Sequence, residues 1–345
     1  MKNDLSIPYE KGYHIVGINR GKPAKLYYEI YGKKNSKNKV VLVMGFMQPG
    51  SAWKFQLDYL LKQTDYEVCI YDNRGIGNSN SLSFSIKTLA HDSIDLVKCL
   101  KWKNVNFVGT SLGGSVCIFI SSFIEKELIN SMTISAPWLG LFAPKIPIGC
   151  YLYVKSVLEK NERKKFEISF KTLFSQNYLN SQSLSNPLKT KNESMIDRAI
   201  EQQQQRQQQN SSKTLFSSLL IVLFLKISPF ILSDIKNKQY LNVCVISGKQ
   251  DILVDLQSIK KRLVNNIKPM NFKILDSGHC VNIETVAQYN KIIVDHIDES
   301  NKLNILKRNN NNCSNTYNIK SNYLCNNNNN ITNYFFKNIL KFFKK

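Results

Sequence analysis

The chain has 345 residues, 43% of them hydrophobic, which is enough for one large globular domain or two smaller ones. Part of its formal charge of +22 is concentrated at the end, because residues 301–345 hold eight Lys or Arg and no acid. Such a basic chain favours acidic membrane surfaces or polyanions without specificity, and no motif indicates specific nucleic-acid binding.

Eight cysteines are scattered along the chain without a Cys-x-x-Cys pair, and residues 1–14 contain no apolar segment typical of a secretory signal. We therefore expect free thiols in a reducing compartment and a cytoplasmic location. The sequence holds no phosphate-binding loop and no metal-ligand cluster, so no cofactor is predicted.

Short β-forming runs alternate with helical spacing over the first 136 residues, beginning with a hairpin around residues 19–23. The expected strands are Tyr13–Ile18, Lys25–Tyr31, Lys39–Met44, Glu67–Tyr71, Asn106–Thr110 and Ile129–Ser135. The expected helices are Ser51–Lys62, Thr88–Leu100 and Leu112–Ile124. This order predicts the α/β class, with a mostly parallel, doubly wound sheet.

The alternation stops after Trp138 and resumes near residue 213, and the interrupted segment includes a glutamine tract at 202–209. We interpret residues 137–212 as a helical cap insertion, with the tract as a surface expansion. The next helix, Thr214–Leu225, is apolar all round. Its uncharged run of 12 residues is short for a bilayer, so a buried helix is favoured.

The last strands are expected at Leu241–Ser247 and Phe272–Leu275, with helices at Asp255–Val264 and Thr285–Ile297. The predicted core comprises residues 1–136 and 213–300, the cap 137–212, an Asn-rich disordered linker 301–332, and a basic amphipathic helix 333–345.

The segment GTSLGG, residues 109–114, follows a strand and opens a helix, as a nucleophile elbow does. Gly109 and Gly113 would let strand and helix pack closely, and Ser111 would be exposed at the turn. The pattern alone also fits an ordinary turn. Asp251 and His279 each lie four residues beyond the end of a late strand, at the edge where α/β sheets collect ligand sites.

Alternative interpretations exist for both residues, since Asp251 could cap the following helix and a loop histidine is usually solvated. The order Ser111, Asp251, His279 favours acyl transfer, which needs a nucleophile, a base and an orienting acid. Five segments then resemble the capped α/β-hydrolase fold family: MGFMQPGSAW (44–53), YDNRGIGNS (71–79), GTSLGG (109–114), SGKQDILV (247–254) and SGHCVNIE (277–284).

The resemblance implies that Ser111 is the nucleophile, His279 the general base and then acid, and Asp251 the orienting carboxylate. It also implies that the backbone amides of Leu112 and Phe46 form the oxyanion hole.

The sequence departs from the family at Met44, where many relatives have a histidine that supports the loop. Asp72 and Arg74 are interpreted as holding a tight turn through an ion pair and backbone hydrogen bonds. Cys280 is expected to be a packing residue, because no second base accompanies it.

A serine at the elbow predicts a serine hydrolase that cleaves a carboxylic ester or acyl-lipid bond through an acyl-enzyme on Ser111. Its partner would be a small-molecule or lipid ester, and the apolar helix at 214–225 favours acyl chains. The alternatives are a non-catalytic or slow member serving as a ligand-binding receptor or scaffold, and a cofactor-free perhydrolase that uses the same three residues.

The tail 333–345 predicts peripheral contact with anionic membranes, because its aromatic and aliphatic residues share one helical face opposite four lysines. The alternative is a tail that packs on its own domain or frays in solvent. Each lysine near an anionic surface contributes about 1 kcal/mol, so the full chain should sediment with anionic liposomes. Deleting residues 333–345 should abolish sedimentation, and unchanged sedimentation would contradict the prediction.

Overall fold

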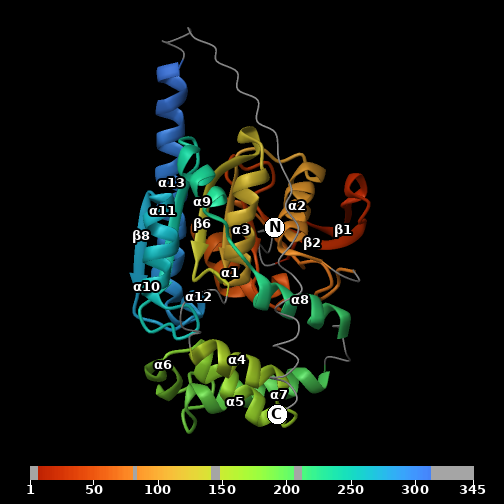
Figure 1. Ribbon diagram of the computed structural model, residues 1–345, viewed down its shortest axis with the longest axis vertical. Coiled ribbons are helices and arrows are strands. Elements are labelled where there is room, and N and C mark those ends of the chain that lie inside the picture. The colour runs from red at the N-terminus through yellow and green to blue at the C-terminus, as the bar shows by residue number, and fades with distance from the viewer. Residues whose placement is uncertain (1–6, 81–83, 141–147, 206–211, 312–345) are drawn as a thin grey trace, which may run out of the picture. The chain divides into compact units, whose positions relative to one another are not determined.

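The computed structural model describes residues 7–80, 84–140, 148–205 and 212–311 (Figure 1). Eight strands form one sheet in the order β1-β2-β4-β3-β5-β6-β7-β8. The strands are β1 (Glu10–Val16), β2 (Ala24–Gly32), β3 (Lys39–Val43), β4 (Glu67–Tyr71), β5 (Val105–Thr110), β6 (Ile129–Ser135), β7 (Asn242–Gly248) and β8 (Asn271–Leu275).

Helices connect the strands and also form the insertion between β6 and β7. The longer helices are α1 (Lys54–Gln63), α2 (Ile86–Cys99), α3 (Leu112–Phe123), α4 (Ile148–Leu158), α5 (Glu162–Leu173), α7 (Lys191–Gln205), α8 (Ser212–Phe224), α9 (Pro229–Asn237) and α13 (Val286–Asn311). The short helices are η1 (Ile18–Arg20), η2 (Gly50–Trp53), η3 (Lys126–Leu128), α6 (Gln176–Asn180), α10 (Leu256–Ile259), η4 (Lys260–Val264), α11 (Asn265–Ile267) and α12 (Val281–Glu284).

The sheet is mostly parallel, as the alternation of strands and helices predicts. β1 pairs with β2 in the expected hairpin, with Val16 opposite Ala24, and β2 pairs antiparallel with β4. The five remaining strand pairs are parallel, so β3 to β8 end at one edge of the sheet. Loops that carry chemistry therefore meet there, although their residues are far apart in sequence.

Alternate residues of the central strands bury opposite faces of the sheet, as the pleat requires. Val41 and Val43 of β3 join the apolar cluster formed with α2, α3 and α9, whereas Val40 and Leu42 join the one formed with α1 and α13. Both faces are covered, which explains why the strand sequences are almost continuously apolar.

The insertion after β6 is helical, as expected, and α4 to α7 lie together (Figure 1). In α8, Ser217, Ser218, Ile221 and Val222 are buried. No helix within the described ranges is long and apolar enough to cross a membrane. The division into core and cap remains a prediction, and the tail 333–345 lies outside the described residues.

Three elements differ from the sequence-based expectations. The helix expected over Asp255–Val264 consists of α10 followed by a π-helical turn, η4. The glutamine tract is helical through Gln205, and its remainder is outside the described residues. The linker predicted from residue 301 is wrong for residues 301–311, because α13 continues to Asn311 where polar asparagines gave no apolar periodicity.

His296 of α13 is 1% exposed, and burial lowers its pKa from the ordinary 6.5 to about 4. Between pH 4 and pH 6.5, His296 binds more protons in the unfolded chain than in the folded one. The free energy of unfolding should therefore fall by about 3 kcal/mol as pH falls from 7 to 4 on account of this residue. His296→Leu should remove most of that loss, measured by urea unfolding at both pH values.

The matched control is His14→Leu on β1, a partly exposed histidine, which should leave most of the acid-induced loss in place. An equal loss in His296→Leu and in the wild-type protein would contradict the assignment.

Candidate functional site

Ser111 occupies the sharp turn between β5 and α3, with backbone angles of φ 54° and ψ −122°. A non-glycine residue in this region carries strain of roughly 1–3 kcal/mol, which the surroundings must hold in place. The backbone amide of Ser111 donates a hydrogen bond to the carbonyl of Ser135 at 2.9 Å. A Cβ on Gly109 would collide with the Gly113 carbonyl, and one on Gly113 with the Val43 carbonyl. The expected need for glycine at both positions is confirmed.

His279 lies within hydrogen-bond distance of both predicted partners. Its Nε2 is 2.8 Å from Ser111 Oγ, and its Nδ1 is 2.8 Å from Asp251 Oδ2. The His279 and Asp251 side chains are 3% and 1% exposed, so the alternative of a solvated histidine is wrong. The structure thus brings together three residues separated by as many as 168 positions.

Asp251 is oriented by the loop after β7, because its second oxygen, Oδ1, accepts the amides of Leu253 at 2.9 Å and Val254 at 2.8 Å. Oδ2 is left for His279. The helix-capping role considered for Asp251 belongs instead to Asp255, whose carboxylate accepts the amide of Ser258 at 2.9 Å.

The two backbone amides predicted to bind an oxyanion come from loops that meet beside Ser111. Leu112 is the first residue of α3, and its amide has no hydrogen-bond acceptor among the described residues, as is usual in a first helical turn. A Cβ built on Gly45 would lie 3.2 Å from Ser111 Cβ and 3.7 Å from the Leu112 nitrogen. The next residue, Phe46, lines the same cavity as Ser111.

The loop after β3 begins with Met44, where the resemblance to the family leads one to expect a supporting histidine, and Asn73 supports it instead. The side-chain amide of Asn73 donates to the Met44 carbonyl at 3.1 Å, and both residues are buried. The neighbouring Asp72 accepts the amides of Gly50 and Asn78, each at 2.8 Å. Asp72 therefore holds the turn through backbone hydrogen bonds, as expected, and links it to the start of η2.

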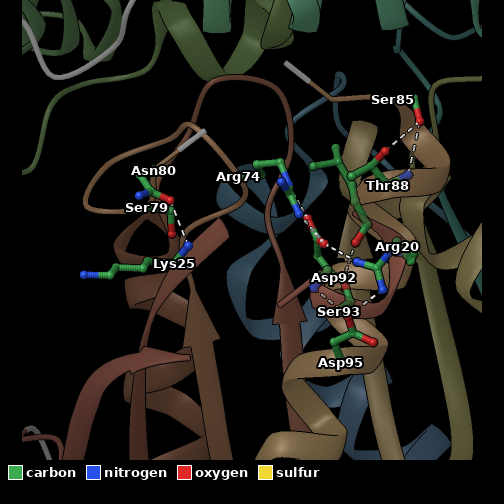
Figure 2. A network of polar contacts seen from close by, with 12 residues as sticks. Arg20, Lys25, Arg74, Ser79, Asn80, Ser85, Thr88, Asp92, Ser93 and Asp95 are labelled. Carbon is green, nitrogen blue, oxygen red and sulfur yellow. Dashed lines mark hydrogen bonds and ion pairs between the residues drawn. The ribbon is translucent and has the colours of Figure 1, made fainter. Parts of the chain in front are cut away.

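Arg74 does not pair with Asp72, so that part of the prediction is wrong. Its guanidinium binds Asp92 of α2 through two contacts of 2.6 and 2.7 Å, and Arg20 also reaches Asp92 (Figure 2). Burial raises the pKa of Asp92, and the contact with Arg74 opposes this effect. Arg20 also contacts Asp95, so the network fastens the turn and the β1–β2 hairpin to α2.

A second carboxylate connects the insertion to the His279 loop and could not be identified from spacing. Glu284 accepts the Gly278 amide at 2.9 Å, and it also accepts both the amide and the hydroxyl of Ser175. Burial raises the pKa of Glu284, while these hydrogen bonds oppose the rise. The sequence carries no signal for this link, because Ser175 and Glu284 are 109 positions apart.

A cavity of about 320 Å³ opens beside Ser111 and His279. Most residues lining the cavity are apolar. They come from the loop after β3 that carries Phe46, from the insertion, from α8 and from α12. The apolar lining residues are Phe46, Trp138, Phe170, Leu173, Phe174, Met195, Val222, Leu223, Leu253 and Ile283. An apolar group joined to a reactive carbonyl could therefore be held next to the serine.

Cys280 also lines this cavity, and burial raises the pKa of its thiol, which keeps it protonated. A protonated thiol is a poor nucleophile, in agreement with the packing role expected for it. Within the described ranges, no group of three or more His, Cys, Asp or Glu side chains is arranged to bind a metal ion.

Comparisons with known proteins agree with this architecture. The chain is 29% identical over 170 residues to ethanol acetyltransferase 1 of Wickerhamomyces ciferrii, a match covering 48% of this chain and 38% of that protein. The chain thus spans about two fifths of the length of the curated relatives it matches.

Two solved structures illustrate the shared fold. A thermophilic esterase from Thermogutta terrifontis is 16% identical, with a TM-score of 0.63 over 84% of this chain and 99% of that one. The enol-lactonase from Burkholderia xenovorans LB400 is 21% identical, with a TM-score of 0.64 over 83% and 100%. The family model described as alpha/beta hydrolase fold matches residues 38–286, and the chain belongs to this family.

Proposed function

We propose that the protein is a serine hydrolase that cleaves a carboxylic ester through an acyl-enzyme on Ser111. This proposal rests on the chain of hydrogen bonds that runs from Asp251 through His279 to the Ser111 hydroxyl, at the wall of an apolar cavity. A base aligned with a serine hydroxyl and fixed by a buried acid is the arrangement that acyl transfer requires.

In the first half-reaction, Ser111 Oγ attacks the ester carbonyl carbon and its proton passes to His279 Nε2. The carbonyl oxygen becomes an oxyanion that the amides of Leu112 and Phe46 stabilise. Collapse of this intermediate breaks the bond to the alcohol, which takes the proton from His279. Water then attacks the acyl-enzyme, giving its proton to His279, and the carboxylic acid is released as Ser111 recovers its proton.

The apolar cavity favours an acyl chain or lipid-like acyl group as the part of the substrate held beside Ser111. The relative named ethanol acetyltransferase supports acyl transfer as the class of reaction, with an alcohol as a second kind of acceptor. The receptor or scaffold alternative would keep the binding cavity with little turnover, and the perhydrolase alternative would use hydrogen peroxide as the acceptor.

Ser111→Ala should abolish labelling by a fluorophosphonate probe and lower kcat for p-nitrophenyl butyrate by at least about 10³-fold, because no other group replaces the nucleophile. Labelling is read on a gel and turnover by absorbance. Cys280→Ala is the matched control, since Cys280 is the other nucleophilic side chain considered in this cavity, and it should still be labelled.

Equal labelling of the wild-type protein and Ser111→Ala would disprove the nucleophile assignment. Labelling that depends on Ser111, combined with negligible turnover of esters of several chain lengths, would favour the receptor alternative.

Asn73→Leu should lower kcat by about 10- to 100-fold with little change in KM, because the Met44 carbonyl loses its donor and the loop carrying the Phe46 amide loosens. The measurement is steady-state hydrolysis of p-nitrophenyl butyrate at constant pH.

Asn80→Leu is the matched control from the same turn. Among the described residues, the Asn80 side chain accepts only the amide of Lys25, in an exposed hydrogen bond, so its loss should leave kcat unchanged (Figure 2). Equal kcat values for Asn73→Leu and the wild-type protein would show that the loop does not depend on Asn73.

A further inference from the structure

Asn282 is a buried polar residue of the cavity whose side chain is unused by the fold. It belongs to α12, which begins two residues after His279, and only 4% of its surface is exposed. Its backbone carbonyl accepts a hydrogen bond from Gln56 Nε2 at 2.8 Å, on the side facing α1. Its side-chain amide makes no hydrogen bond to any residue in the described ranges.

Two observations indicate that the unpaired amide faces the cavity. Asn282 lines the cavity together with Ser111 and His279, and neither of its amide atoms is among the fully enclosed polar atoms that lack a partner. Since the residue is almost entirely buried, the cavity is the accessible surface that the amide can reach. Burying an amide without a hydrogen-bond partner is unfavourable in free energy. This cost is removed when a bound molecule supplies the missing hydrogen bonds.

The carboxylates around the site and the Asn73 amide are already paired by the protein. Asp251 holds two amides and His279, Glu284 holds Ser175 and Gly278, and Asn73 holds the Met44 carbonyl. Among the described residues, two amide side chains line the cavity: Gln48 is exposed, whereas Asn282 is buried and can offer a donor and an acceptor to whatever occupies the cavity. An amide offers both an N–H donor and a carbonyl acceptor, so it suits a hydroxyl, keto or amide group.

We propose that Asn282 is a specificity-determining residue that hydrogen-bonds a polar group on the acyl part of the substrate. This inference rests on the proposed ester hydrolysis at Ser111 and narrows its substrate class. The preferred substrates are esters whose acyl group carries a hydroxyl or keto oxygen a few atoms from the scissile carbonyl. The acyl part is assigned because it stays bound to Ser111 through both half-reactions, whereas the alcohol leaves.

The test compares p-nitrophenyl butyrate with p-nitrophenyl 2-hydroxybutyrate and 3-hydroxybutyrate, in the wild-type protein and in Asn282→Leu. The wild-type protein should favour one of the hydroxy esters over butyrate by about tenfold in kcat/KM. In Asn282→Leu this ratio should fall to about one or below, because an apolar side chain then faces the hydroxyl.

A stability measurement separates specificity from a structural role. Asn282→Leu keeps the backbone contact with Gln56 and removes an unpaired buried amide, so its Tm should stay the same or rise. A purely structural asparagine would instead lower Tm on replacement. Met195→Leu is the matched control, a volume-conserving change in the apolar wall that should leave the hydroxy-ester ratio unaltered.

The proposal is overturned if the wild-type protein does not discriminate between butyrate and either hydroxy ester, or if Asn282→Leu keeps the wild-type ratio. In both cases, Ser111-dependent turnover of butyrate would leave the proposed hydrolysis standing. Turnover and fluorophosphonate labelling that persist in Ser111→Ala would show instead that the underlying hydrolysis proposal is wrong, and the Asn282 assignment would be rejected with it.

Discussion

The site depends on the close packing of β3, β5 and α3 around Ser111. Gly109 and Gly113 sit where any Cβ would strike a backbone carbonyl, and Ser111 is held in a conformation that an isolated peptide would rarely adopt. The surrounding core is buried on both faces of the sheet and holds this turn in place. A strained turn raises the hydroxyl above the sheet edge and leaves the first amide of α3 beside it.

The other parts of the site are fixed by loops that follow parallel strands. Each loop uses a carboxylate or amide to hold backbone groups, which suits an edge where strand hydrogen bonding has ended. Asp72 binds the amides of Gly50 and Asn78, Asp251 those of Leu253 and Val254, and Glu284 that of Gly278. The positions of side chains at the site are therefore determined mainly by bonds to the main chain.

Sequence reasoning predicted the sheet, its helices and the residues that meet at its edge, because apolar periodicity and strand ends are local signals. Supporting contacts were harder to predict. The hydrogen bond from Asn73 to Met44 spans 29 positions and that from Ser175 to Glu284 spans 109, and neither leaves a spacing to recognise. The prediction that Arg74 pairs with Asp72 rests on proximity in the sequence, whereas the folded chain places Asp92 of α2 in contact with the guanidinium. The four residues of α12 are too few to show helical periodicity.

Polar groups around the cavity are of two kinds: those already hydrogen-bonded within the protein, which hold the loops in place, and those without a partner, which can bind a substrate. Buried polar groups are normally paired, so an unpaired group at a cavity wall points to a missing partner. Around this cavity the carboxylates of Asp251 and Glu284 and the amide of Asn73 are occupied, whereas the Leu112 amide and the Asn282 side chain have no acceptor or donor among the described residues. Leu112 follows the proposed nucleophile at the start of α3, and Asn282 belongs to α12. A substrate that satisfies both must carry two polar groups, and this requirement distinguishes it from a simple aliphatic ester.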